Sequence, residues 1–323
     1  MNDICHTSQP TTQFLVQKIS FKSDDRPGLR GLVAVAVVSS AVRNFRERQN
    51  VRATWADPRV VRLTGIASVF VVGGTTSARA QRALVRESLA FRDIVQADFL
   101  DTYNNLSLKS LAGIWWGAQH CAQAPWILKT DDDVSVNVFA LSEYLLHYAG
   151  STEPEAALHM PTFTDNPDLR ESTKRCTGAH CVVLCDKISL RARAVDNNSY
   201  QFGVSAAEWR LPTYPPYCHG VGYLVPTTAV PALMEAAATS TYIRVEDVFV
   251  TGILARAAGL RIAHMHPPVP WQYALHAHDR ALLFIAGIRL TLELDRDLEG
   301  GRLTGSQVWR MLLERHNVTL DQS

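Results

Sequence analysis

Two short runs, residues 32–38 and 66–72, constrain the fold of this chain more than any other feature. The first reads LVAVAVV and the second IASVFVV, so both are rich in valine and almost continuously apolar. A strand with one face in water alternates polar and apolar residues, whereas a strand buried on both faces of a parallel sheet does not. The two runs therefore predict buried strands of a parallel sheet.

The segments around these runs extend the pattern. Residues 94–99 and 126–129 are expected to form a third and a fourth strand, and residues 44–55 are typical of a basic helix. A longer helix is predicted where apolar residues recur at spacings of three and four, and Asn104 or Asn105 is placed to cap it. Its apolar positions are Leu108, Leu111, Trp115, Ala118 and Ala122. Strands that alternate with helices predict an α/β fold, with a Rossmann-like, mostly parallel central sheet and helices on both faces.

The second half of the sequence is less regular. Residues 210–225 are loop-rich and aromatic, and residues 230–238 are expected to form a helix with Pro231 in its first turn. Another helix is expected from about residue 246 to Gly259, because glycine commonly ends helices. A last helix is predicted over residues 305–316.

Three consecutive aspartates, Asp131, Asp132 and Asp133, directly follow the predicted strand at 126–129. Two like charges 4 Å apart repel by up to about 4 kcal/mol at a protein-like dielectric. In doubly wound sheets, ligands bind outside the carboxyl ends of the strands. As a bare pattern, three aspartates are more often a solvated turn, but their place after a buried strand favours a binding site.

The ligands that this cluster offers are all oxygens, which suit Mg²⁺, Mn²⁺ or Ca²⁺. A calcium loop would need alternating acidic residues, a glycine and a later glutamate, and the sequence DDDVSVN does not provide them. A divalent ion that is held by one or two carboxylates and by a substrate diphosphate fits better.

Length and charge limit the classes of protein. A chain of 323 residues permits one large domain or two smaller ones, and we expect a polar tail over residues 1–30 and a single domain over residues 31–323. The formal net charge of +1 gives no bulk basic field for nucleic acid. The longest run of low polarity, residues 31–42, is shorter than the ~20 residues of a membrane span, so we expect a soluble chain or one that has lost an anchor.

Cysteines and glycosylation sequons favour an oxidising compartment. Acceptor triplets begin at Asn105, Asn197 and Asn317. The six cysteines are Cys5, Cys121, Cys176, Cys181, Cys185 and Cys218. Three of them lie close together beside His180, but their spacing contains no C-x-x-C pair, so disulfides or buried thiols are favoured over a zinc site.

Six blocks of sequence occur in the order and spacing of a known family. They are residues 42–55, 70–73, 93–110, 126–137, 214–225 and 244–255. Over residues 32–280 the chain resembles the β-1,3-galactosyltransferases and β-1,3-N-acetylglucosaminyltransferases. The resemblance implies a GT-A fold, a UDP-sugar donor, dependence on Mn²⁺, and inverting transfer to a hydroxyl of a glycan.

The resemblance also implies roles for the acidic residues. Asp133 matches the aspartate that binds the metal, and Asp131 matches the one on the ribose side, with Asp132 and Lys129 assigned to the same donor site. Asp247 matches the general base, although an acid in the first turn of a helix also complements the helix dipole.

A histidine downstream is expected to be the second metal ligand. His276 is our assignment, because the family has such a histidine after an apolar residue. The competing histidines are His264, His266 and His278.

Further donor-site residues come from the other blocks. Arg48 and Arg52 lie four apart, hence on one helix face, and guanidinium groups suit phosphate or uracil oxygens; the alternative is a solvated basic face. Asp98 and Asp101 fall in the block that resembles the nucleotide wall, where Lys109 is expected to pair with an acid.

Two glycines and several aromatic residues complete the assignments. Gly220 and Gly222 would let the backbone approach the sugar, or would form a tight turn. The aromatic residues Tyr214, Tyr217 and Trp209 either stack on acceptor rings or belong to the core.

The leading hypothesis is an inverting hexosyltransferase that moves galactose from UDP-galactose in β-1,3 linkage onto a glycan. The alternatives are a UDP-GlcNAc-dependent enzyme and an inactive glycan-binding homologue. A dinucleotide-dependent oxidoreductase is set aside, because the segment after the first strand, VVSSAVRN, has no glycine. The departures from the family, Ser135, His219 and the segment CTGAHCVVLC, bear on the acceptor. By the resemblance we expect the Golgi lumen, with a type II membrane anchor absent from this chain.

Overall fold

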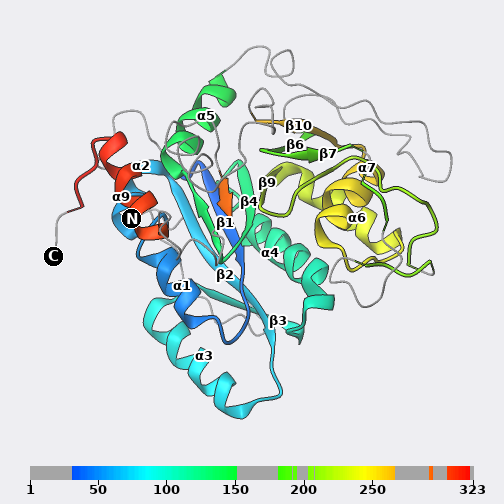
Figure 1. Cartoon of the computed structure of the whole chain (residues 1–323), viewed down its shortest axis with the longest axis horizontal. Helices are drawn as coiled ribbons and strands as arrows, with labels where there is room; N and C mark the ends of the chain where they lie inside the picture. The colour runs from blue at the N-terminus through cyan, green and yellow to red at the C-terminus, as the bar shows by residue number, and fades with distance from the viewer. Residues whose placement is uncertain are drawn as a thin grey trace.

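The computed structural model describes residues 31–150, 181–190, 192–194, 203–206, 208–265, 291–293 and 304–320. Its centre is a seven-stranded sheet in the order β10-β6-β9-β4-β1-β2-β3 (Figure 1). These strands are β1 (Ala34–Ser39), β2 (Ile66–Gly74), β3 (Ile94–Leu100), β4 (Trp126–Asp131), β6 (Val182–Cys185), β9 (Gly222–Pro226) and β10 (Arg261–His264). Only β9 runs antiparallel to its neighbours, β4 and β6. The predicted α/β fold with a mostly parallel sheet is therefore confirmed.

The core lies on both faces of the first strands, as their composition predicts. Every residue of β1 from Ala34 to Val38 is at most 1% exposed, and Val69 to Val72 of β2 are equally buried. Both faces of these strands are covered, which explains why they have no polar alternation. All four strands expected in the first half of the chain are present.

The larger helices cover this sheet. They are α1 (Phe45–Arg52), α2 (Pro58–Thr64), α3 (Ala78–Phe91), α4 (Leu106–His120), α5 (Val138–Gly150), α6 (Val230–Thr239) and α9 (Gly305–Arg315). Figure 1 shows α4 and α6 on one side of the central strands and α1 and α2 on the other. The basic helix predicted over residues 44–55 is shorter than expected, because it ends at Arg52. Trp55, which follows it, is buried, and its indole N–H donates to Val134 O at 3.1 Å.

Helix α4 packs closely on the sheet because two glycines face it. A Cβ atom on Gly113 would lie 2.8 Å from Val71 Cγ2, and one on Gly117 would lie 3.3 Å from Ile127 Cδ1. Such distances leave no room for a larger side chain at Gly113. The two glycines therefore set how near α4 lies to β1, β2 and β4.

The helix expected from residue 246 to Gly259 has a different form. The helical segment begins at Glu246, as expected, but residues Val248–Leu254 form a π-helix, and Ala255–Ala257 (α7) are α-helical again. Gly259 has a positive φ of 73° and ends the segment, as predicted. Asp247 has helical backbone angles and lies in the first turn of this helical segment, directly before the π-helix, as expected.

Smaller elements complete the described part of the chain. Strand β5 (Val134–Val136) pairs with β11 (Thr291–Glu293), and β7 (Ile188–Ser189) pairs with β8 (Tyr217–Cys218). A disulfide joins Cys185 of β6 to Cys218 of β8. Cys121 and Cys181 are also disulfide-bonded, which agrees with the preference for disulfides over a zinc site. Among the described residues, no helix has the length and apolarity that a membrane span requires.

Candidate active site

The carboxyl ends of β1 and β4 lie side by side where the strand order reverses. From β1 the chain continues to β2 and β3 on one side, whereas β4 lies on the other side of β1. The parallel register places Asp131 beside Ser39. In open α/β sheets, ligands bind in the crevice at such a switch point. The three aspartates therefore lie at the edge of the sheet where a ligand is expected.

Asp131 and Asp247 line the same pocket, although they are far apart in the sequence. The pocket has a volume of about 100 Å³ and also contains Lys129, Gly220 and Glu246. Its remaining lining residues are Tyr103, Leu106, Arg244 and Val245. The structure thus brings together the donor-side aspartate and the expected general base in one cavity.

The three consecutive aspartates have different surroundings. The side chain of Asp131 is 31% exposed, and Asp133 is exposed at the turn between β4 and β5. Asp132 points inward, and its Oδ2 accepts hydrogen bonds from Ser40 Oγ at 2.6 Å and from Asn44 Nδ2 at 3.0 Å. Burial raises the pKa of Asp132 to about 6, against the two hydrogen bonds that lower it. Asp132, which we expected in the donor site, holds the loop that follows β1 through these two hydrogen bonds.

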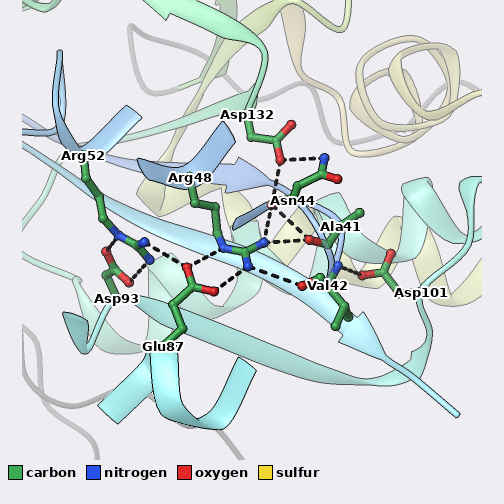
Figure 2. A network of polar contacts seen from close by, with 10 residues as sticks. Ala41, Val42, Asn44, Arg48, Arg52, Glu87, Asp93, Asp101 and Asp132 are labelled. Atoms are coloured by element: carbon green, nitrogen blue, oxygen red, sulfur yellow. Dashed lines mark hydrogen bonds and ion pairs between the residues drawn. The ribbon is translucent and has the colours of Figure 1, made fainter. Parts of the chain in front are cut away.

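Arg48 is fully buried behind this loop (Figure 2). Its Nε and Nη2 donate to the two carboxylate oxygens of Glu87, at 2.8 and 2.5 Å. Its Nη1 donates to Ser40 Oγ at 2.8 Å and to Ala41 O at 2.6 Å. A continuous chain of polar contacts therefore runs from Glu87 through Arg48 and Ser40 to Asp132. The sequence assigned Arg48 to the nucleotide, whereas its guanidinium donates to groups of the protein.

Arg52 lies on the same face of α1 as Arg48, as the spacing predicted, and it also has partners within the protein. It forms ion pairs with Glu87 at 2.8 Å and with Asp93 at 2.7 Å. Its guanidinium lies 4.1 Å from the ring centre of Phe91. These contacts place Arg52 in the packing between α1 and α3 rather than against an open cavity.

The two aspartates of the expected nucleotide wall differ from each other. Asp101 Oδ2 accepts from the backbone N–H groups of Val42 at 3.0 Å and Gly73 at 3.2 Å, and its Oδ1 lies 2.7 Å from Lys109 Nζ. The expected pairing of Lys109 with an acid is confirmed. Asp101 therefore ties the loop after β1 to the end of β2. Asp98 is exposed on β3.

Lys129 is enclosed directly behind the pocket. Its Nζ lies 3.0 Å from Asp131 Oδ1 and 3.1 Å from Glu246 Oε2, and it donates to Gly220 O at 3.1 Å. Burial by itself lowers the pKa of Lys129, but the charges of Asp131 and Glu246 outweigh it and raise the pKa above its usual value. Lys129 is therefore a permanent cation between the two acidic sides of the pocket.

Asp247 is oriented by two backbone donors. Its Oδ2 accepts from Gly220 N at 3.2 Å and its Oδ1 from Val248 N at 2.9 Å. Burial raises the pKa of Asp247 to about 7; the charge of Glu246 raises it further, whereas Lys129 and the two backbone N–H groups lower it. A carboxylate whose pKa lies near neutral pH suits general base catalysis.

Gly220 and Gly222 lie in different parts of the structure. Gly220 lies beside the acidic residues, because a Cβ atom there would be 3.5 Å from Glu246 Oε2 and 3.7 Å from Asp247 Oδ2. Gly222 begins β9 and pairs with Thr130 of β4. Of the two, only Gly220 lines the pocket.

Aromatic side chains gather beside Asp247. The ring centres of Trp209 and Tyr214 are 5.7 Å apart, those of Tyr214 and Tyr217 are 6.3 Å apart, and Tyr217 stacks on His219 at 5.8 Å. Burial raises the pKa of Tyr214 to about 12 and also that of Tyr217, and the charge of Asp247 adds to both shifts. Burial lowers the pKa of His219 to about 4, so this ring is neutral at physiological pH.

The acidic turn fits a metal ion that arrives with a substrate diphosphate. In the described part of the chain, no three His, Cys, Asp or Glu side chains cluster closely enough to hold an ion by themselves. Magnesium-like ions commonly take only one or two carboxylates and complete their shell with water and phosphate. Asp131 lines the pocket, and Asp133 follows it by two residues in the chain and is exposed. Asp133 can therefore supply such a carboxylate.

The histidine assignment falls outside this region. His276, His266 and His278 lie outside the described residues. His264 is on β10, which is three positions from β4 in the sheet, and its Nδ1 lies 3.4 Å from Asp186 O. His264 is therefore not part of the pocket.

Several residues that build the site were not anticipated from the sequence. Ser40 and Asn44 follow a predicted strand, so their place at its carboxyl end was an available signal. Glu246 directly precedes Asp247, and its acidic character beside the expected base was also visible. Tyr223 and Glu87, by contrast, reach the site through tertiary packing and have no local signal.

The comparisons with known proteins define the family. The Galactosyltransferase family profile matches residues 46–266. The chain is 30% identical over 232 residues to β-1,3-galactosyltransferase 5 of Pan troglodytes, and the matched region covers 72% of this chain and 68% of that protein. It is 33% identical over 236 residues to β-1,3-galactosyltransferase 4 of Mus musculus, covering 71% of this chain and 61% of that protein. The chain belongs to the galactosyltransferase family.

This membership makes the protein a hexosyltransferase, which takes a sugar from a donor to a glycan acceptor. Among solved structures, the galactosyltransferase LgtC in complex with donor and acceptor sugar analogs is 12% identical, with a TM-score of 0.32 over 89% of this chain and 97% of that one. The S. aureus protein TarS is 10% identical, with a TM-score of 0.35 over 88% of this chain and 43% of that one.

Proposed function

We propose that this chain transfers galactose from UDP-galactose to a hydroxyl of a glycan, in β-1,3 linkage and with inversion at the sugar. The observation that carries the proposal is the shared pocket of Asp131 and Asp247. Inversion needs a base on the side of the sugar opposite the leaving nucleotide. A cavity that has Asp131 on the donor side and Asp247 as a second acid meets this requirement. The names of the relatives support galactose and the β-1,3 linkage.

Asp247 is the general base of this proposal. It accepts the proton of the acceptor hydroxyl as the hydroxyl oxygen attacks the sugar, a contribution typically of about 10²–10⁴-fold. The N–H groups of Gly220 and Val248 fix the carboxylate in place before the acceptor arrives. Its pKa of about 7 keeps a substantial fraction ionised at neutral pH and still favours proton uptake. Of the expected aromatic residues, Tyr214 is buried in the core, whereas the partly buried Tyr217 and Trp209 would present flat apolar faces to the acceptor sugar.

Asp131 and Asp133 form the donor side. Asp133 would hold a divalent ion, Mn²⁺ by the resemblance, together with oxygens of the UDP diphosphate, and Asp131 would face the ribose. When bound, such an ion stabilises the negative charge of the departing diphosphate as a Lewis acid. Asp132 keeps the acidic turn in place through Ser40 and Asn44.

We further propose that the protein acts in the lumen of the Golgi apparatus as a type II membrane protein. The disulfide between Cys185 and Cys218 supports an oxidising compartment. The family resemblance supports the Golgi and the anchor.

The first test is a donor screen with the Asp247→Asn variant as its partner. We expect the wild-type chain to release UDP from UDP-galactose in the presence of Mn²⁺ and a β-linked glycan acceptor. Asp247→Asn keeps the shape of the side chain but removes the base, so we expect UDP affinity to be retained and transfer to fall by about 10²-fold or more. UDP release and product analysis by mass spectrometry measure the two effects.

Three outcomes contradict parts of this proposal. Turnover of UDP-GlcNAc in place of UDP-galactose would change the donor but keep the mechanism. Glycan binding without turnover of any UDP-sugar would make the chain a binding protein. Normal transfer by Asp247→Asn would remove the base assignment.

The metal assignment predicts a different behaviour for Asp133. Asp133→Ala removes an exposed carboxylate, so we expect little change in stability but a loss of about tenfold or more in Mn²⁺-dependent UDP affinity. Calorimetric titration of UDP with and without Mn²⁺ measures it. The control is Glu235→Ala, which removes an exposed carboxylate of α6 and should leave the affinity unchanged. If the two variants bind UDP equally well with Mn²⁺, Asp133 does not hold the metal.

A further inference from the structure

Lys129 is held within the protein by one hydrogen bond and two ion pairs. A lysine ammonium group has three N–H donors and no acceptor. The Nζ atom has three oxygen partners at 3.0–3.1 Å: Asp131 Oδ1, Glu246 Oε2 and Gly220 O. The side chain is only 1% exposed. The ammonium group of Lys129, which the family resemblance assigned to the donor, is therefore surrounded by oxygens of the protein on the inner side of the pocket.

Glu246 is enclosed in the same way. Its side chain is 3% exposed, and its Oε1 accepts the hydroxyl of the fully buried Tyr223 at 2.5 Å. Its other oxygen, Oε2, is the partner of Lys129. Removing one partner of a buried ion pair leaves an uncompensated charge, which is strongly unfavourable. Lys129 and Glu246 are therefore a matched pair, held by β4 on one side and by β9 on the other.

This pair touches both halves of the site. On the donor side, Lys129 contacts Asp131, two residues further along β4. On the acceptor side, Lys129 binds the carbonyl of Gly220, whose N–H donates to Asp247, and Glu246 directly precedes Asp247 in the chain.

We propose that Lys129 and Glu246 are positioning residues: their buried ion pair holds the general base Asp247 in a fixed place relative to Asp131 and sets the charge that the base experiences. Neither residue touches the substrate. The inference rests on the proposed function in one respect, namely that Asp247 is the base of the reaction.

The charged and titratable groups around Asp247 determine the direction in which each substitution should shift the pKa of this residue. They are Glu246 beside it, Lys129 from β4, Tyr223 from β9, Tyr214 and Tyr217 from the aromatic cluster, and Arg244 at the pocket wall. The tyrosines are neutral near pH 7, because burial raises the pKa of each of them. The negative charge of Glu246 disfavours ionisation of Asp247, and the positive charge of Lys129 favours it. Removing one or the other should therefore move the titration of the base in opposite directions.

The experiment is the pH profile of kcat/KM for Lys129→Met, Glu246→Gln and the double variant. The reaction needs ionised Asp247, so the rate falls as pH drops through the pKa of this residue, near 7. We expect Lys129→Met to move this acid limb to higher pH by about one unit, and Glu246→Gln to move it to lower pH by a similar amount. The double variant should return towards the wild-type profile.

The control is Lys109→Met. It also removes a buried lysine that pairs with an aspartate, but Lys109 contacts Asp101 behind the loop after β1 rather than the pocket. We expect it to lower stability and leave the acid limb in place. Shifts of the same sign in the two single variants, or no shift in either, would overturn the proposal. If Lys129→Met does not fold, the downward shift of Glu246→Gln alone still decides the matter.

Thermal melting tests the pairing without any activity. If the pair is matched, the double variant should melt at a higher temperature than Lys129→Met, because the buried charge of Glu246 is then no longer left unpaired, while the partly exposed Asp131 is the same in both variants. A double variant that melts below both single variants by the sum of their losses would contradict the pairing. If no donor is turned over at all, the proposed function fails, and the melting cycle still reports on the ion pair separately. If Lys129 contacts the donor directly, Lys129→Met should lose UDP affinity, and the double variant should not regain it.

Discussion

Buried charges in this protein occur in pairs that fix the surroundings of the pocket. Arg48 pairs with Glu87, Lys109 with Asp101, and Lys129 with Glu246, at distances of 2.5–3.1 Å. Such pairs contribute little net stability compared with apolar packing, but they are directional. The Arg48 and Lys109 pairs hold the loop that follows β1, and the Lys129–Glu246 pair lies against the pocket of Asp131 and Asp247. Their main effect is therefore on geometry.

The Arg48–Glu87 pair predicts a measurable loss when it is broken. Arg48→Met keeps most of the side-chain volume but leaves Ser40, Ala41 and one side of Glu87 without their donor. We expect the free energy of unfolding to fall by about 3 kcal/mol, at the lower end of the range for broken buried pairs because Arg52 still neutralises Glu87. Urea denaturation measures this loss.

The same variant should weaken UDP binding, because Ser40 loses the donor that fixes it against Asp132. Arg43→Met, an exposed arginine just before α1, is the matched control and should change neither stability nor UDP affinity. Equal urea midpoints for the two variants would show that the buried network contributes nothing to stability.

For the three consecutive aspartates, the sequence predicted the position but not the surroundings of each side chain. Their position after a buried strand correctly placed the acidic residues at the ligand edge of the sheet. The different surroundings of the three side chains were not predictable. The partners that turn Asp132 inward, Ser40 and Asn44, lie about ninety residues away in the sequence. The same applies to Arg48, since a basic helix face has the same pattern whether it binds a nucleotide or a buried glutamate.

Among the elements, the fully buried strands were the most predictable. β1, β2, β3 and β4 each combine a short apolar run with a turn, and that combination is specific for a parallel sheet covered on both faces. Strands β6 and β9 were missed because they lie in the irregular half, where β9 enters the sheet antiparallel between β6 and β4. That placement depends on tertiary pairing rather than on local pattern. It also brings Gly220 and Tyr223 next to Lys129, which lies opposite Tyr223 in the register.

The π-helix at Val248–Leu254 shows the limit of periodicity. The apolar spacing predicted a helix but could not distinguish its hydrogen-bond pattern. Thr251 Oγ1 donates to Asp247 O at 2.6 Å and accepts from Cys218 N at 2.9 Å. The unusual turn therefore links the base to β8. Such π-helical turns are frequent at functional sites, which agrees with the place of Asp247 at its start.

At the scale of the whole molecule, the side of the pocket that we propose for the acceptor is attached to the sheet through the Cys185–Cys218 disulfide. Cys185 ends β6, and Cys218 immediately precedes His219 and Gly220, whose N–H donates to Asp247. The donor side is independent of this link, because Asp131 is held by the pairing of β4 with β1. The two halves of the site are thus supported by different parts of the fold.

This division predicts separate effects when the link is removed. In the Cys185→Ser, Cys218→Ser double variant, a cross-link over 33 residues is lost, and we expect the free energy of unfolding to fall by about 3–4 kcal/mol. We also expect kcat to fall while UDP affinity with Mn²⁺ is retained, since the loop that orients Asp247 loosens and β4 does not. Urea denaturation, steady-state kinetics and calorimetry measure the three quantities. Thr304→Ala, which removes the capping box of the remote helix α9, controls for a general loss of stability and should leave kcat unchanged. A parallel loss of UDP affinity and kcat in the cysteine variant would mean that both halves of the site depend on the disulfide, contrary to the separate supports seen in the fold.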